Sequence, residues 1–224
     1  MKNFVFILCT VLIAFGGIVQ KVEAVPITFT FEGTVVSVDP VLGEIFDRSQ
    51  VLSGSYTFES TTKDISLRDP NRGAYRVLDL TYTIGSYTGT LDGSHGGVIP
   101  IKAFLSKVYH DSYAMTARTS GPLVADYNPG SFSFFIRYRD AQFSDDSLPL
   151  TPPPLLNVYG NRWNAGFWYR DEKLNILEAR VEGKLTALGL SPDPAHVPAP
   201  ATMFLLTSGL LALVGFRRMS KRKQ

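Results

Sequence analysis

Between residues 25 and 190 the chain repeatedly alternates apolar and polar residues, and this alternation limits its fold more than any other feature. A period of two places every second side chain on the same side of an extended strand, so one side can be buried while the other faces water. No apolar segment of useful length with the 3.6-residue period of a helix occurs there. The body is therefore predicted to be all β. Its clearest alternating apolar positions are Val25, Ile27, Phe29 and Phe31; Leu52, Gly54, Tyr56 and Phe58; Leu78, Leu80, Tyr82 and Ile84; Phe132, Phe134, Ile136 and Tyr138; and Ala179, Val181, Gly183, Leu185 and Ala187.

Turn residues separate these runs at the spacing of about ten residues that is typical of all-β domains. The dipeptide Gly85-Ser86 stands between the runs 78–84 and 87–91, which predicts a β-hairpin. Further strands are expected within 98–108 and 113–118. The 15 Phe and 10 Tyr, beside 19 Gly and 14 Pro, favour strands joined by tight turns. The predicted fold is a single antiparallel β-sandwich, jelly-roll-like, over residues 25–190.

One segment, residues 140–162, interrupts this pattern. It contains a pair of aspartates and three consecutive prolines at 152–154. Proline has no N–H to donate to a sheet, so the segment is predicted to be a long surface loop or an extended connection. We interpret it as an insertion within one sandwich, and a boundary between two subdomains is the alternative.

The N-terminus, residues 1–24, has the features of a secretory signal peptide. Lys2 supplies a positive start, and an apolar run without a charge follows it. Val22 and Ala24 occupy the two positions that a signal peptidase reads, which predicts cleavage between Ala24 and Val25. An uncleaved N-terminal anchor is the alternative.

The only cysteine, Cys9, lies inside this apolar run. The mature chain is therefore expected to have no thiol, which excludes disulfides, cysteine catalysis and cysteine–zinc sites. A chain without thiols suits an oxidising location outside the cytoplasm.

The C-terminus joins a Pro-rich linker, an apolar segment and a basic end. Residues 191–200 contain four prolines, residues 201–216 are predicted to be a transmembrane helix, and residues 217–224 a basic cytoplasmic tail. At ~1.5 Å per residue this helix reaches only about 24 Å, short of a ~30 Å hydrocarbon core, so it spans only if the flanking bases snorkel and the bilayer thins. The bases are expected to stay in the cytoplasm and to leave the body outside. The orientation signal consists of Arg217, Arg218, Lys221, Arg222 and Lys223.

The order of linker motif, short apolar segment and basic end resembles the PEP-CTERM sorting signal. In that family a Pro-Glu-Pro-like motif precedes a short transmembrane helix and an Arg-rich end. Here Ala199 stands where the family has its central Glu, and the segment ends in Gly215-Phe216-Arg217-Arg218. The corresponding sorting motif is Val197, Pro198, Ala199 and Pro200.

This resemblance implies a partner, an exosortase-type protease, in a Gram-negative-type bacterium that makes exopolysaccharide. It implies that signal peptidase acts first and that the inner membrane then holds an intermediate whose body lies in the periplasm. The final location would be the cell surface or the extracellular matrix. A plain tail anchor that keeps the protein in the periplasm is the alternative.

Charge and candidate chemistry argue against several other function classes. The termini hold seven of the 22 basic residues and one of the 20 acidic ones, so residues 25–200 carry 15 basic and 19 acidic residues, a net charge of −4. This gives no electrostatic reason to expect nucleic acid as a partner. His95 lies in a turn, and His196 has no second His at metal-ligand spacing. His110-Asp111-Ser112 cannot form a hydrolase triad, because neighbouring residues of a strand face opposite sides. We therefore expect no enzyme activity, no metal and no cofactor.

The aromatic segment 159–169 is the best candidate for a binding site. Aromatic faces stack on sugar rings, and Asn or Arg side chains bond to hydroxyl groups, so its composition suits a glycan. The alternative is that Phe167 and Tyr169 belong to the core and that Trp163 closes one end of the sandwich. Coplanar, exposed indoles would favour a binding module, and buried indoles a scaffold. The candidate glycan contacts are Tyr159, Trp163 and Trp168.

These features together predict an exported structural protein of the cell surface or of an exopolysaccharide or biofilm matrix, processed by an exosortase-type system. A carbohydrate-binding module, with exopolysaccharide as the partner, is the first alternative. A plain tail-anchored periplasmic protein is the second.

Overall fold

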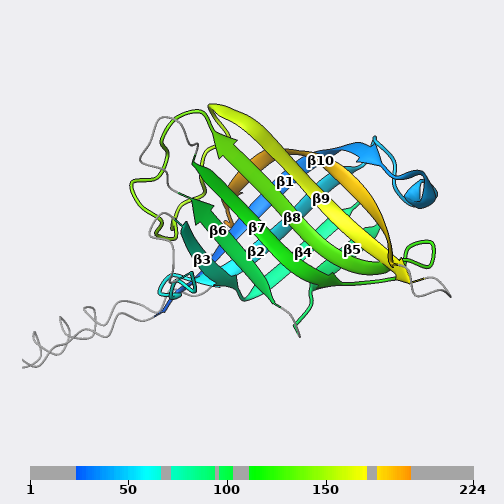
Figure 1. The fold of residues 1–224 in the computed structure, drawn as a ribbon, viewed down its shortest axis with the longest axis horizontal. Helices are drawn as coiled ribbons and strands as arrows, with labels where there is room; N and C mark the ends of the chain where they lie inside the picture. Colours follow the sequence, from blue (N-terminus) through cyan, green and yellow to red (C-terminus); the bar gives the residue numbers. More distant parts are fainter. Residues whose placement is uncertain (1–23, 67–71, 94–95, 103–110, 171–175, 193–224) are drawn as a thin grey trace, which may run out of the picture.

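The computed structural model describes residues 24–66, 72–93, 96–102, 111–170 and 176–192 (Figure 1). These residues form ten β-strands and one short 3-10 helix. In chain order the elements are β1 (Pro26–Val38), η1 (Pro40–Leu42), β2 (Val51–Glu59), β3 (Arg72–Val77), β4 (Asp79–Ile84), β5 (Tyr87–Leu91), β6 (Gly97–Lys102), β7 (Ser112–Ser120), β8 (Asn128–Tyr138), β9 (Val158–Arg170) and β10 (Ile176–Leu190).

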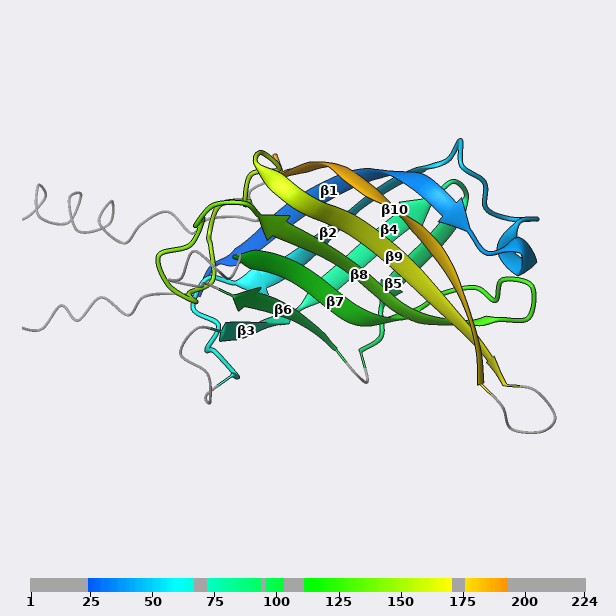
Figure 2. The same cartoon turned by 45° about the horizontal axis from the view of Figure 1, so that its top comes forward.

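The strands form one antiparallel sheet that closes into a barrel of eight strands, and Figure 2 shows how they wrap into a continuous wall. The ring runs β1, β2, β4, β5, β7, β8, β9, β10, and β10 then pairs with β1 to complete it. β3 and β6 lie outside this ring and pair with each other. β3 continues into β4 with only Leu78 between them, and β6 pairs with β7, which also pairs with β5. The β3–β6 pair therefore extends the β4–β5 hairpin along the wall.

The predicted jelly-roll-like β-sandwich is therefore wrong. A sandwich has two sheets with open edges, whereas here β1 pairs with both β2 and β10, and β7 with both β5 and β8. Neighbouring strands follow one another around the wall, without the crossovers of a jelly roll. Alternation and turn spacing are the same in both folds, since each buries one side of every strand. The difference lies in the long-range pairing of β1 with β10.

The two ends of the described chain leave the barrel side by side. β1 begins and β10 ends at the same end, where the Ser191 N–H donates a hydrogen bond to the Thr28 carbonyl over 2.9 Å. We call this the terminal end. The opposite end, which carries η1 and the β4–β5 turn, is the far end.

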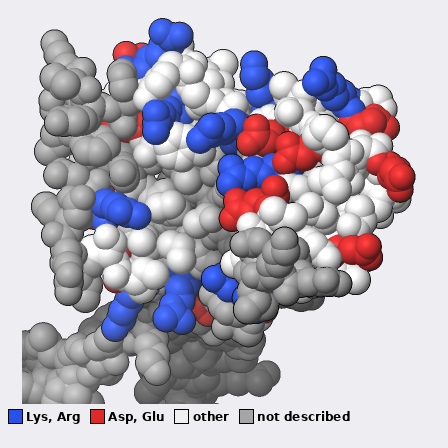
Figure 3. All heavy atoms as spheres, turned by 45° about the vertical axis from the view of Figure 1, so that its right-hand side comes forward, with Lys and Arg blue, Asp and Glu red and all other residues white. Residues whose placement is uncertain are grey.

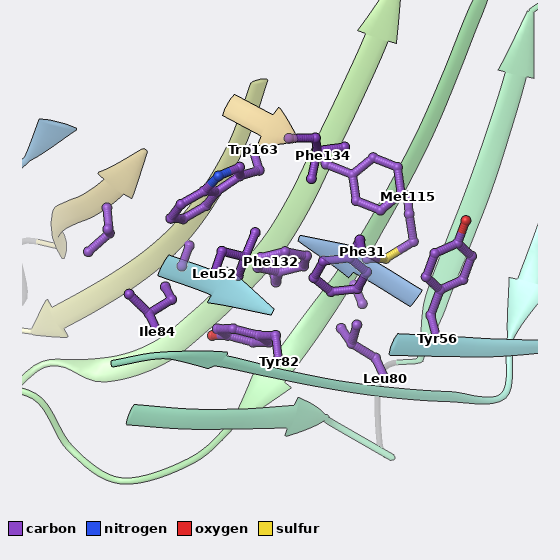
Figure 4. Close-up of a cluster of buried hydrophobic side chains, with 14 of the residues drawn as sticks. Phe31, Leu52, Tyr56, Leu80, Tyr82, Ile84, Met115, Phe132, Phe134 and Trp163 are labelled. Atoms are coloured by element: carbon purple, nitrogen blue, oxygen red, sulfur yellow. The ribbon is translucent and has the colours of Figure 1, made fainter. Parts of the chain in front are cut away.

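Aromatic rings fill the interior of the barrel, and Figure 4 shows several of them turned toward one another. The Phe132 ring lies 4.4 Å from Tyr82, 5.3 Å from Phe31 and 6.4 Å from Trp163, measured between centroids, and it is stacked on all three. These four rings come from β8, β4, β1 and β9, so they connect separate parts of the wall. The barrel interior is thus a packed core, which is what large buried rings stabilise best.

Inward-facing glycines make room for the widest rings. A Cβ atom on Gly183 of β10 would lie 2.6 Å from Cζ2 of Trp163, and one on Gly33 of β1 would lie 2.7 Å from its Nε1. The carbonyl oxygens of Thr34 and Lys184 lie nearer still, so the indole and the neighbouring strand together exclude any side chain at these two positions. A glycine beside a large ring lets the ring lie flat against the wall. The same arrangement recurs where Phe31 lies over Gly54 and where Tyr82 lies over Gly89.

Most of the predicted inward positions are confirmed, and two are wrong. The apolar members of 29–31, 52–58 and 132–138 are buried or partly buried, and the β4–β5 hairpin turns at Gly85, with φ of 58°. Leu78 is 51% exposed because it interrupts the strand between β3 and β4. Ala187 is exposed because Thr186 is an extra residue in β10 that shifts the β1–β10 register.

The predicted surface loop turns out to cover the terminal end of the barrel. β9 begins at Val158, so the connection is residues 139–157. The buried Asp111 carboxylate accepts the N–H groups of Gln142 and Phe143 at 2.6 and 2.8 Å. On the other side, the Tyr75 hydroxyl donates to the Asp146 carbonyl over 2.9 Å. Side chains of this connection pack against the core, among them Phe143, Leu148 and Leu155.

Within the described ranges there is no helix with the length and apolarity needed to cross a membrane. The predicted transmembrane helix (201–216), the sorting motif (197–200), the basic tail (217–224) and all of the signal peptide except Ala24 lie outside the described residues. The fold that the structure describes is therefore the barrel, without the flanking helix that the predicted fold class included.

Candidate functional site

β9 places the three predicted glycan contacts on two different faces. Trp163 is 0% exposed and lies inside the barrel, whereas Trp168 and Tyr159 are 38% and 42% exposed. The three therefore do not form one surface, and the two indoles are not exposed together. Of the alternative core assignments, Phe167 is buried, while Tyr169 is half-buried and packs on Tyr127 with ring centroids 5.6 Å apart.

A groove of about 610 Å³ lies on the outer wall where β8, β9 and β10 run side by side. Phe135 and Arg137 of β8 form one side, and Lys184 of β10 forms the other. Tyr159 and Arg162 of β9 lie between them. The groove falls within the 300–1,000 Å³ range that is typical of small-ligand sites.

Arg137 is held over two aromatic rings. Its guanidinium carbon lies 4.7 Å from the centroid of Phe135 and 6.0 Å from that of Tyr159. Arg137 pairs in register with Gly160, where an added Cβ would lie 3.5 to 3.8 Å from the arginine side chain. These are ordinary van der Waals distances, so the arginine stem lies close to the β9 backbone at Gly160, and the rings attract its charge.

The floor of the groove is formed where the ladder between β9 and β10 ends. The last paired residues of that ladder are Trp163 and Gly183. Beyond them the Asn161 side chain replaces the backbone: its Nδ2 donates to the Leu185 carbonyl over 2.8 Å, and its Oδ1 accepts the Leu185 N–H at 3.1 Å. The Asn161 amide thus bridges β9 and β10 where their backbones separate. This separation opens the hollow on the outside of the wall.

Three positive charges converge on this groove from three strands. Arg137, Arg162 and Lys184 are exposed, and none of them forms an ion pair with another described residue. The residues that line the groove include no carboxylate. Like charges that share a site repel one another, so an anionic ligand would be favoured here.

A second, smaller hollow of about 330 Å³ follows along the same strand toward the far end. Trp168 lines it, with its indole N–H donating to the Pro129 carbonyl over 3.1 Å. On β10 the Arg180 guanidinium and the Glu178 carboxylate form an ion pair of 2.8 Å at its border. In contrast to the first groove, the charges here are balanced.

Figure 3 shows how charge is distributed over one side of the molecule. Basic side chains lie mostly on the left half of this view, whereas acidic side chains lie in the middle and toward the right. On this side the surface therefore carries patches of both signs.

Tyrosine hydroxyls are the main polar groups inside the barrel. The hydroxyl groups of Tyr56 and Tyr113 lie 2.7 Å apart, and burial raises the pKa of both phenols well above the usual value. Near the terminal end, burial and then the carboxylates of Asp64, Asp146 and Asp145 raise the pKa of Tyr75 to about 12. These phenols stay neutral at physiological pH, so they act as hydrogen-bonding groups of the core and are poorly suited to proton transfer.

Of the remaining candidates the structure describes only Asp111 and Ser112. Asp111 anchors the loop 139–157, and Ser112 lies in β7. His95, His110 and His196 lie outside the described residues. Within the described ranges no three His, Cys, Asp or Glu side chains are grouped so that they could hold a metal ion.

The sequence-based prediction missed Phe135, Arg137 and Lys184. One signal was present, because Phe135 is an aromatic residue on the polar side of the alternating run 131–137. The convergence with Arg162 and Lys184 was not visible, since it depends on the register between three strands.

Comparisons with known proteins give no further guidance on the function. The chain matches no protein-family model, no curated protein and no solved structure.

Proposed function

We propose that the chain is an exported structural protein, displayed at the cell surface or in an exopolysaccharide matrix, and that an exosortase-type protease processes its C-terminal sorting signal. The observation that carries this proposal is the position of the chain ends on the closed barrel. Leu190 pairs with Phe29 at the terminal end, and the sorting motif follows within a few residues. A cut at that motif removes no strand, so the barrel can be released or transferred intact.

The construction of the barrel also supports a role outside the cytoplasm. Closure pairs the edges of the wall, and paired edges protect a sheet from aggregating with other sheets. Packed rings supply the stability that a mature chain without cysteine cannot obtain from disulfides. Both properties suit a body that is displayed rather than one that turns over a substrate.

Intact-mass measurement of the protein recovered from its native host tests the proposal. We expect a chain that begins at Val25 and lacks the residues after the sorting motif. Pro198→Ala/Pro200→Ala should remain full-length after residue 24 and stay with the membranes, because without proline the segment can become helical and hide the extended peptide that a protease needs. The matched control, Pro192→Ala/Pro194→Ala in the same linker, should be processed like the wild type.

Two results would contradict this. If the motif variant and the control are processed identically, the sorting-signal interpretation fails, and if neither wild type nor variant is cut, a plain tail anchor replaces it. A chain that begins at Met1 on exported material would show that the N-terminus is an uncleaved anchor.

Glycan binding is a second candidate function, and the exposure of Trp168 favours it. The bond to the Pro129 carbonyl fixes the indole at the edge of a hollow, where its face can stack on a sugar ring. Trp168→Ala should lower retention on exopolysaccharide from the native host, while Trp168→Phe keeps most of it. Leu123→Ala, an exposed apolar side chain elsewhere, is the control. Equal retention of all three variants would exclude Trp168 as a contact.

A further inference from the structure

We propose that the groove beside Arg137 binds the carboxylate groups of an acidic polysaccharide, which lies along the outer face of β9 from Tyr159 to Trp168. This inference deepens the glycan-binding candidate and rests on it. It does not depend on export or on tail processing. It names the class of glycan, a chain that contains uronate-type sugars, and adds contacts from β8 and β10 to those of β9.

Charge complementarity identifies the ligand as an anion. Arg137, Arg162 and Lys184 reach one groove from three adjacent strands and are not neutralised by any described carboxylate. Elsewhere on the same wall, by contrast, Arg180 is paired with Glu178. The groove therefore collects three cations that no described carboxylate pairs, and it carries no carboxylate of its own.

The groove is also organised before a ligand arrives. Phe135 and Arg162 are paired in register across β8 and β9, and Arg137 is paired with Gly160. The two rings hold the Arg137 guanidinium in place, so little side-chain freedom is lost when it binds. A guanidinium is planar and matches a carboxylate with two parallel hydrogen bonds.

A sugar is favoured over a simple anion because rings and amides accompany the cations. Tyr159 is exposed beside the groove, and Trp168 is exposed at the second hollow. Between them Asn164 lies on the outer face, with its Nδ2 donating to the Ser133 hydroxyl over 2.9 Å. Aromatic faces, an amide and hydroxyl groups are the partners that pyranose rings use.

The two hollows follow each other along one strand, which indicates a polymer. Arg162 lines the first hollow and Asn164 lines the second, and they are successive outward positions of β9. From Tyr159 to Trp168 an extended strand covers about 30 Å. A chain of sugars can contact this whole length, and many weak contacts along it add up.

The surroundings argue against nucleic acid. Glu178 and Glu182 lie on the outward-facing side of β10, the strand that also carries Lys184, and residues 25–200 carry a net charge of −4. A phosphate at every nucleotide would meet these carboxylates. A polysaccharide in which uronate sugars alternate with neutral sugars can place its carboxylates in the first groove and its neutral sugars beyond it.

The test uses the full chain, purified in a nonionic detergent, with polygalacturonate as the acidic probe and dextran as the neutral one. The groove variant is R137Q/R162Q/K184Q. The control variant, R48Q/K63Q/R76Q, removes the same charge from exposed positions outside β7 to β10. We expect the groove variant to weaken polygalacturonate binding by about tenfold or more, and the control by less than about twofold. Monomeric galacturonate should bind far more weakly than the polymer, and higher salt should weaken both.

Equal losses in the two triple variants would overturn the proposal, because binding would then follow net charge alone. Equal binding of dextran and polygalacturonate would overturn the acidic specificity. Tighter, groove-dependent binding of oligo-dT or of phosphatidylglycerol vesicles would assign the groove to nucleic acid or lipid instead. If Trp168→Ala abolishes glycan binding while the groove variant does not change it, the glycan-binding candidate survives and this inference fails. If no glycan binds at all, both fail.

Discussion

Trp163 and Trp168 lie on the same strand, and the barrel uses them in opposite ways. Trp163 faces inward, is completely buried, and its Nε1 has no hydrogen-bond partner among the described residues. Trp168 faces outward, is 38% exposed, and donates its N–H to the Pro129 carbonyl. Both residues suit a glycan site by type. The side of the strand on which each residue lies, not the residue type, decides which of them belongs to the core and which to the surface.

The same contrast separates the glycines on the two sides of the wall. Inside, Gly33 and Gly183 leave space for the Trp163 indole. Outside, a Cβ added to Gly160 would meet the Arg137 side chain at an ordinary contact distance of 3.5 to 3.8 Å. A side chain is thus excluded at the two inward glycines but not at the outward one, where the Phe135 and Tyr159 rings position Arg137. Stability should therefore depend on the inner face, and binding on the outer face of β8 to β10.

Substituting the two tryptophans separately should give the largest difference between the faces. Trp163→Ala should lower the free energy of unfolding by about 3–5 kcal/mol, because it leaves a cavity among stacked rings. Trp168→Ala should cost less than about 1 kcal/mol, because the ring is already partly in water. Urea unfolding of the purified protein measures both. Equal costs would mean that the inward and outward assignments of β9 are wrong.

Alkaline pH should have the second-largest effect, because it lowers the stability that buried tyrosines give the interior of the barrel. Tyr56 and Tyr113 are buried, and burial raises the pKa of each above 10.0, so the unfolded chain releases these protons before the folded barrel does. Their contribution is complete below pH 10 and is lost as the pH rises above it. The free energy of unfolding should fall by about 1.4 kcal/mol per pH unit for each tyrosine.

Urea unfolding between pH 9 and 11 measures this slope, with Tyr56→Phe/Tyr113→Phe as the control that should make it shallower. The prediction fails if absorbance shows that all ten tyrosines of the folded protein ionise together near pH 10.

A methyl group on an inner glycine should have a smaller effect. Gly183→Ala forces the Trp163 indole or the neighbouring backbone to move and should cost about 1–3 kcal/mol. Gly93→Ala is the control, because an added Cβ there meets nothing within 4 Å. The thermal melting temperature of each variant is the measurement. If both variants melt like the wild type, the interior is less tightly packed than the ring distances indicate.

The local parts of this fold were predictable, and the long-range parts were not. The alternation around Tyr56 and Phe134 identified β2 and β8 and their buried sides, since burying one side of a strand leaves a pattern in the sequence itself. The extra residue Thr186 left no such pattern, so Ala187 was assigned to the wrong side. In the site, Tyr159 and Trp168 were selected by composition, whereas Lys184 was missed because its neighbours come from other strands.

The sequence by itself determined that the body is built of strands, which sides of most of them are buried, and that no thiol follows residue 24. Only the tertiary structure decided that the strands close into a barrel, that Trp163 and Trp168 are separated, and that three cations share a groove. The physical reason is that a two-residue period shows only which side of each strand avoids water. Closure and the groove depend on which strand lies beside which and in what register, and those choices are made by contacts between residues far apart in the chain.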